Sequence, residues 1–114
     1  MHLAELSRRA LEIRSRYAAL ETAQGGAPWT RAELAQGFAG DVGALMKLVM
    51  AKDGRRAGPP DIEDRLAHEL ADCLWSVLVL ADACGVDLEK AFLETMVQLE
   101  AKLARGLVPP PPAP

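Results

Sequence analysis

The 114-residue chain has few aromatic residues, although it is rich in hydrophobic ones. Phe, Trp and Tyr make up only 4% of the sequence, while hydrophobic residues make up 50%. Most of this hydrophobic content is Ala, Leu and Val, with only isolated Ile, Thr and Tyr, and this composition favours helices over β-sheet. The length and the 25% share of charged residues are typical of a single globular domain.

The chain also lacks an excess of basic charge and a long hydrophobic run. It contains 13 Lys and Arg against 16 Asp and Glu, and the two signs are interspersed, so we expect no nucleic acid polymer as a partner. The longest charge-free stretch around Cys73 is Cys73–Ala81, well short of the roughly 20 residues of a membrane-spanning helix. Because the first segment mixes charged with apolar residues, it does not read as a signal peptide. We expect a soluble, cytoplasmic protein without a membrane partner.

Cysteine and histidine are scarce, with two residues of each. Cys73 and Cys84 lie in one expected helix, where eleven residues separate them by roughly 16 Å, too far for a disulfide within that helix. Free cysteines in an apolar run behave as small hydrophobic residues and suit a reducing compartment. His2 and His68 have no partner at metal-ligand spacing, which argues against a zinc site.

Hydrophobic spacing and capping signals predict four helices within one domain, residues 1–106. Apolar residues recur three or four positions apart in each segment, the spacing of one helical face. The predicted helices run from about residue 3 to 22, from a capping box of Thr30 and Glu33 to near Gly54, from Asp61 to Gly85, and from Asp87 to about 105. Residues 107–114 form a proline-rich tail, interpreted as an unstructured terminus or as a ligand for a proline-reading domain.

The third predicted helix is the most apolar part of the chain. From Cys73 to Ala81 it is apolar on all sides apart from Ser76, a pattern typical of a helix buried on most of its surface. Four short helices can hardly cover such a helix alone. We therefore predict an all-α four-helix bundle that assembles as a homodimer or a dimer of dimers through the second and third helices.

Two carboxylates of the third helix are not explained by capping or by a solvated face. Glu69 and Asp72 are three positions apart and share one helix face, just before the most apolar turns. Buried carboxylates must be paired, protonated or bound to a cation. Either Arg65 forms an ion pair with them, or they bind Mg²⁺, which prefers oxygen ligands. Asp41 on the second helix is a candidate third ligand.

These residues resemble a known family, the MazG-like all-α NTP pyrophosphohydrolases. The string Glu69-Leu70-Ala71-Asp72-Cys73-Leu74-Trp75 is similar to the Glu-x-x-Asp motif that opens an apolar helix in that family, and residues 81–88 are similar to the helix end and cap that follow. The resemblance covers about residues 29–92. Where the family has an earlier Glu-x-x-Glu motif, this chain has Asp41-Val42-Gly43-Ala44, so three carboxylates are present instead of four.

The resemblance implies that the protein hydrolyses nucleoside or deoxynucleoside triphosphates to a monophosphate and pyrophosphate, with removal of non-canonical nucleotides as one role. It implies Mg²⁺ or Mn²⁺ as cofactor, with Asp41, Glu69 and Asp72 as metal ligands and catalytic residues. Such a metal neutralises phosphate charge and lowers the pKa of an attacking water. The candidate substrate contacts are Lys47, Lys52, Arg55 and Arg56 for phosphates and Trp29 for the base.

Other interpretations of the same residues stay open. Basic residues at a helix C-terminus also complement the helix dipole, and a tryptophan also serves plain core packing. Glycines within the second helix, such as Gly40 and Gly43, indicate either close helix packing or room for a ligand. Because Ala44 cannot bind a metal, the alternative function is a non-catalytic helical bundle that binds a nucleotide or a protein partner.

Overall fold

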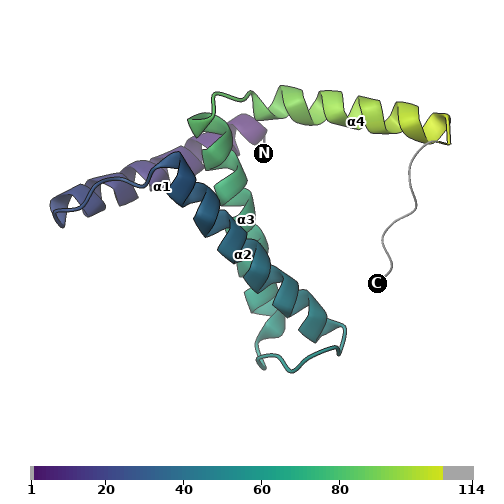
Figure 1. Cartoon of the computed structure of the whole chain (residues 1–114), viewed down its shortest axis with the longest axis horizontal. Helices are drawn as coiled ribbons and strands as arrows, with labels where there is room; N and C mark the ends of the chain where they lie inside the picture. Colours follow the sequence, from purple (N-terminus) through teal and green to yellow (C-terminus); the bar gives the residue numbers. More distant parts are fainter. Residues whose placement is uncertain (1, 107–114) are drawn as a thin grey trace.

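The computed structural model describes residues 2–106, and within this range the chain is helical with no strand. Four helices follow one another: α1 (Leu3–Ala23), α2 (Arg31–Lys52), α3 (Ile62–Ala83) and α4 (Leu88–Ala104) (Figure 1). The predicted all-α class and the four predicted helices are thereby confirmed, with ends that differ by a few residues. The proline-rich tail predicted for residues 107–114 lies outside the described residues.

The capping signals act at two of the three predicted helix starts. The Thr30 hydroxyl accepts a hydrogen bond from the Glu33 amide at 3.2 Å, and the Glu33 carboxylate accepts one from the Thr30 amide at 3.1 Å. Asp87 likewise accepts from the amide of the third residue after it. Asp61 makes no such bond, because its backbone, with ψ of 34°, does not have the extended conformation typical of an N-cap. Its carboxylate contacts Arg65 at 3.1 Å instead.

Glycines with positive φ end α2 and α3. Gly54 has φ of 74° and Gly85 has φ of 68°, a backbone conformation that other residues rarely adopt. The residue after each glycine donates a hydrogen bond back to the last helical turn, from Arg55 to Met50 and from Val86 to Ala81. This is the glycine-dependent helix stop expected from the sequence. After the first of these stops the chain reverses, and α2 and α3 form an antiparallel hairpin (Figure 1).

The small hydrophobic core lies where α1 crosses this hairpin. It consists of buried side chains from all three helices: Ala10, Leu34, Leu78 and Val79. The Trp75 indole donates a hydrogen bond of 3.2 Å to the carbonyl oxygen of Ala10, which ties α3 to α1. Helices α1 to α3 therefore form one packed unit.

Helix α4 extends away from this unit (Figure 1). None of its residues is buried, although Leu88 at its first turn packs against the core. The large apolar side chains Phe92, Leu93 and Val97 are exposed. Across residues 2–106, no helix combines the length and the hydropathy that crossing a membrane requires.

Candidate metal centre

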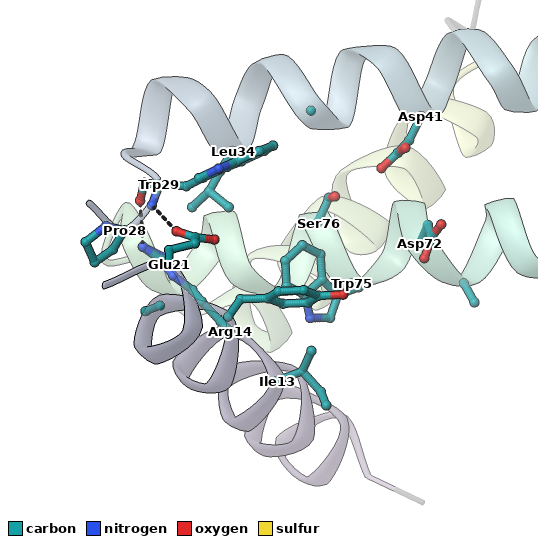
Figure 2. Close-up of a pocket in the computed structure, with 14 residues that line it drawn as sticks. Ile13, Arg14, Glu21, Pro28, Trp29, Leu34, Asp41, Asp72, Trp75 and Ser76 are labelled. Carbon is teal, nitrogen blue, oxygen red and sulfur yellow. Dashed lines mark hydrogen bonds between the residues drawn. The ribbon is translucent and has the colours of Figure 1, made fainter. Parts of the chain in front are cut away.

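Three carboxylates from α2 and α3 converge at the hairpin. One oxygen each of Asp41, Glu69 and Asp72 lies within 4.8 Å of the other two, and all three residues are partly buried. Figure 2 shows Asp41 and Asp72 reaching toward each other from the two helices. The structure thus brings together the three acidic residues singled out in the sequence.

The cluster arises from helix geometry in two steps. Glu69 and Asp72 share a face because residues three apart are neighbours on a helix. Asp41 joins them because α2 packs antiparallel to α3 and the face of α2 that carries Asp41 is turned toward α3. A Cβ added at Gly40 or Gly43 would meet no atom within 4 Å, so neither glycine permits a close helix contact.

The Oε2 atom of Glu69 is buried and has no hydrogen-bond partner among the described residues. The ion pair with Arg65 that the sequence allowed does not form, because Arg65 contacts Asp61 instead. Burying a polar group without a hydrogen-bond partner costs about 1 to 3 kcal/mol, and a charged carboxylate oxygen costs more. A bound cation would remove this cost, and clustered carboxylate oxygens are the ligands that Mg²⁺ and Mn²⁺ prefer. The donor set therefore fits either ion.

His68 holds one of the three carboxylates. Its Nε2 lies 3.1 Å from Oδ2 of Asp72, one helical turn away. This contact orients the Asp72 carboxylate and leaves its other oxygen available to a metal, as outer hydrogen bonds do for metal ligands generally. The metal-ligand spacings in the sequence assign no role to His68, but its spacing of four residues to Asp72 predicts the contact.

The thiol of Cys73 lies within the electrostatic influence of the cluster. Desolvation by burial, and then the negative charges of Asp41, Glu69 and Asp72, raise the pKa of this thiol above its ordinary value. The thiol therefore stays protonated at neutral pH and adds no charge to the cluster. Both Cys73 and Cys84 are free, and neither takes part in a disulfide.

A cavity of about 550 Å³ adjoins the cluster, and Asp41 and Asp72 form part of its wall. Its aromatic lining comes from Tyr17, Trp29 and Trp75. The rings of Tyr17 and Trp75 pack edge to face, with centroids 6.4 Å apart. A volume of this size and a mainly apolar wall with a few polar groups are typical of small-molecule sites.

Two polar contacts from α1 hold Trp29 at this cavity (Figure 2). The Trp29 amide donates to Oε2 of Glu21 at 3.2 Å, and its carbonyl accepts from the Arg14 guanidinium at 3.3 Å. Gly37 makes room for the indole ring, because a Cβ there would lie only 3.1 Å from Cζ3 of Trp29. Trp29 remains 48% exposed, so part of the residue is accessible to a ligand.

Arg14 is a functional candidate that the sequence analysis missed. It lines the cavity, whereas periodicity alone gives no reason to single out one arginine of α1. The four predicted phosphate contacts do not line the cavity: Lys47, Lys52, Arg55 and Arg56. Lys52 is paired with Glu63 at 2.7 Å, and both arginines are exposed in the loop that joins α2 to α3. Of the predicted substrate contacts, only Trp29 lies at the cavity.

Comparison of the chain with protein-family models, with curated proteins and with solved structures finds no match. The function is therefore inferred from the chemistry of the carboxylate cluster and of the cavity beside it. The resemblance to the MazG-like family adds a hypothesis about the reaction.

Proposed function

We propose that this protein is a Mg²⁺-dependent nucleoside triphosphate pyrophosphohydrolase. The observation that carries the proposal is the buried Oε2 of Glu69, which has no partner and belongs to a cluster with Asp41 and Asp72. The adjoining cavity has aromatic walls and is large enough for a small ligand. A cation site next to an aromatic cavity suits a molecule that combines a charged phosphate chain with a flat base.

The three carboxylates hold the metal in this proposal. When bound, Mg²⁺ or Mn²⁺ supplies neutralisation of phosphate charge and activation of water for attack at a phosphorus atom. Without a cation, Asp41, Glu69 and Asp72 repel a polyphosphate. Nucleotide binding is therefore expected to depend on the metal, while His68 keeps Asp72 oriented toward it.

The cavity wall binds the base and part of the phosphate chain. Trp29 offers an accessible indole face for stacking, and its backbone is held in place from both sides by Glu21 and Arg14. Arg14 is the cation available in the wall. Contacts from Lys47, Lys52, Arg55 and Arg56 to the phosphates stay a prediction.

The setting proposed for this activity is a homodimer or a dimer of dimers in the cytoplasm. The free cysteines are compatible with a reducing compartment. The exposed apolar side chains of α2, α3 and α4 favour self-association, because covering apolar side chains that are exposed to water is favourable.

The test is pyrophosphate release from a panel of canonical and modified nucleoside triphosphates by the full chain, with MgCl₂ or MnCl₂. We expect release that requires the metal and is abolished by Glu69→Gln, which keeps the side-chain shape but removes the charge. Asp82→Asn is a matched control on the same helix, because Asp82 is exposed and lies outside the cluster. Pyrophosphate release that is unaffected by Glu69→Gln would contradict the assignment of the site.

One observation favours a second candidate function, a bundle that binds nucleotide without hydrolysing it. Ala44 lies one turn after Asp41 and is partly buried, so the cluster has three carboxylates where two-metal hydrolysis commonly uses more. Calorimetry separates the two functions. Binding of Mg²⁺ and nucleotide without turnover supports the binder, whereas binding of neither contradicts both functions.

A further inference from the structure

Helix α4 carries an apolar stripe that is largely exposed beyond the first turn, where Leu88 packs against the core. Its members lie three or four positions apart, so they share one face of the helix: Leu88, Phe92, Met96, Leu99 and Leu103. Leu93 and Val97 widen this stripe and are 58% and 63% exposed. In proteins most of the stability of a helix comes from the packing of its apolar face. The stripe therefore needs a partner surface.

A second uncovered apolar surface lies on the α2–α3 hairpin, and we name it the hairpin flank. It consists of Val42, Met46 and Val49 on α2 with Leu70 and Leu74 on α3. These side chains are exposed by 43% to 58% of their surface. At 3.6 residues per turn on antiparallel helices, the two sets fall on the same side of the hairpin. That side is opposite to the cavity, whose wall includes Asp72 and Trp75.

One chain in this conformation does not bring the two surfaces together. The turn between α3 and α4 is short, with Gly85 at a φ of 68° and Asp87 capping α4. From this turn α4 points away from the hairpin (Figure 1). Each chain therefore has one exposed apolar helix and one exposed apolar flank. In a pair of chains, the helix of each copy can cover the flank of the other.

We propose that α4 of one copy packs on the hairpin flank of a second copy, and that the exchange is reciprocal. A pair of α4 helices alone would leave both flanks uncovered. Each copy contributes ten exposed large apolar side chains, five on the flank and five on α4, and each of the ten is exposed by 40% to 64%; those of α4 are Phe92, Leu93, Val97, Leu99 and Leu103. At about 100 Å² for a fully exposed side chain, two copies bury about 1,000 Å² of apolar surface. This apolar area alone is about the minimum of 1,000 Å² for a biological interface, and the polar atoms around it would add to the total.

The proposal specifies how the chain associates and does not depend on the hydrolase activity. Its first test is the mass of the full chain in solution, measured by gel filtration with light scattering. We expect particles of two or four chains. Val97→Glu on α4 and Met46→Glu on the flank should each release monomers that keep their helical circular dichroism. Leu20→Glu on α1 is the matched control, because Leu20 is 52% exposed and belongs to neither surface. A monomeric wild-type chain overturns the proposal.

The second test identifies which helices meet, and it uses the unmodified sequence. The four lysines of the chain lie only on α2 and α4: Lys47, Lys52, Lys90 and Lys102. Chains labelled with ¹⁴N and ¹⁵N are mixed and treated with an amine-reactive cross-linker. We expect mixed-isotope peptides that join a lysine of α2 to a lysine of α4.

Three results of the cross-linking would overturn the proposal. Mixed-isotope links between α4 lysines alone indicate that α4 pairs with α4. Links from α2 to α4 that always carry a single isotope indicate that α4 folds back on its own hairpin. The absence of any link from α2 to α4 indicates that the flank has another occupant, such as residues 107–114.

Discussion

Asp41 of α2 and Asp72 of α3 each place a carboxylate oxygen within 4.8 Å of the other across the helix hairpin. Two like charges at this distance oppose the packing of α2 on α3. The packing of α2 on α3 therefore includes an unfavourable electrostatic repulsion at this site. A cation bound between the two carboxylates would replace this repulsion with attraction.

Removal of one charge from this pair should stabilise the metal-free protein. We expect Asp41→Asn to raise the free energy of unfolding by about 1 kcal/mol at neutral pH, the scale of one unit-charge repulsion near 5 Å in a largely solvated setting. Urea unfolding followed by circular dichroism in the presence of EDTA measures the change. Asp53→Asn is the control, because Asp53 is exposed beyond the end of α2. Destabilisation by Asp41→Asn would mean that the carboxylates do not repel each other.

Mg²⁺ should raise the melting temperature, because it binds the folded cluster and not the unfolded chain. At a free concentration ten times its Kd the gain is about 1.4 kcal/mol. Differential scanning calorimetry over a series of MgCl₂ concentrations measures it, and EDTA should reverse it. Glu69→Gln should abolish the shift while Asp82→Asn keeps it. An equal shift in both variants would indicate general salt stabilisation.

A carboxylate introduced at position 44 should strengthen metal binding. Ala44 follows Asp41 by three residues and is partly buried on α2, so Ala44→Glu adds a fourth oxygen donor at the edge of the cluster. We expect Mn²⁺ to bind about tenfold more tightly, equivalent to about 1.4 kcal/mol. Isothermal titration calorimetry measures the affinity. Ala39→Glu, at an exposed position of the same helix, should leave the affinity unchanged.

Truncation of Trp29 should weaken nucleotide binding without changing metal affinity. Stacking of a base on an aromatic side chain contributes about 1 to 3 kcal/mol, so Trp29→Ala should lower nucleotide affinity by about tenfold or more. Titration with a non-hydrolysable nucleoside triphosphate at saturating Mg²⁺ measures the loss. Trp29→Phe should recover part of it. Unchanged affinity in Trp29→Ala would place the base elsewhere than at this indole.

The thiol of Cys73 should react slowly with alkylating reagents at neutral pH. Its pKa is raised by desolvation and by three neighbouring carboxylates, and only the thiolate reacts. Peptide mass spectrometry should show alkylation of exposed Cys84 first and a rise at Cys73 only in alkaline solution. Because Asp72→Asn removes one negative charge, it should lower the pKa of Cys73 and move this rise to lower pH. No movement would mean that the charge of Asp72 does not contribute to the raised pKa of Cys73.

Local signals in the sequence accounted for the helices and for part of the site. The capping box of Thr30 and Glu33 and the positive-φ stop at Gly54 depend only on residues within a few positions of each other. Glu69 and Asp72 share a face for the same reason, since the helical repeat alone brings them together. Such features are readable because no distant contact is needed to form them.

The rest of the site depended on contacts between distant segments. Asp41 joins the cluster only because α2 packs antiparallel to α3, and Arg14 reaches Trp29 only because residues 24–30 turn the chain back along α1. Arg65 could have paired with Glu69 or with Asp61, which are both one turn away, and the conformation at the start of α3 decided for Asp61.

The sequence by itself determined four amphipathic helices and their ends, because periodicity and capping act locally. Only the tertiary structure decided which apolar faces are covered. Val79 of α3 is fully buried, whereas Val97 of α4 is 63% exposed, although both are the same residue type within a helix. The difference arises from the short turn around Gly85, which directs α4 away from the hairpin and leaves its apolar stripe without a partner in the same chain.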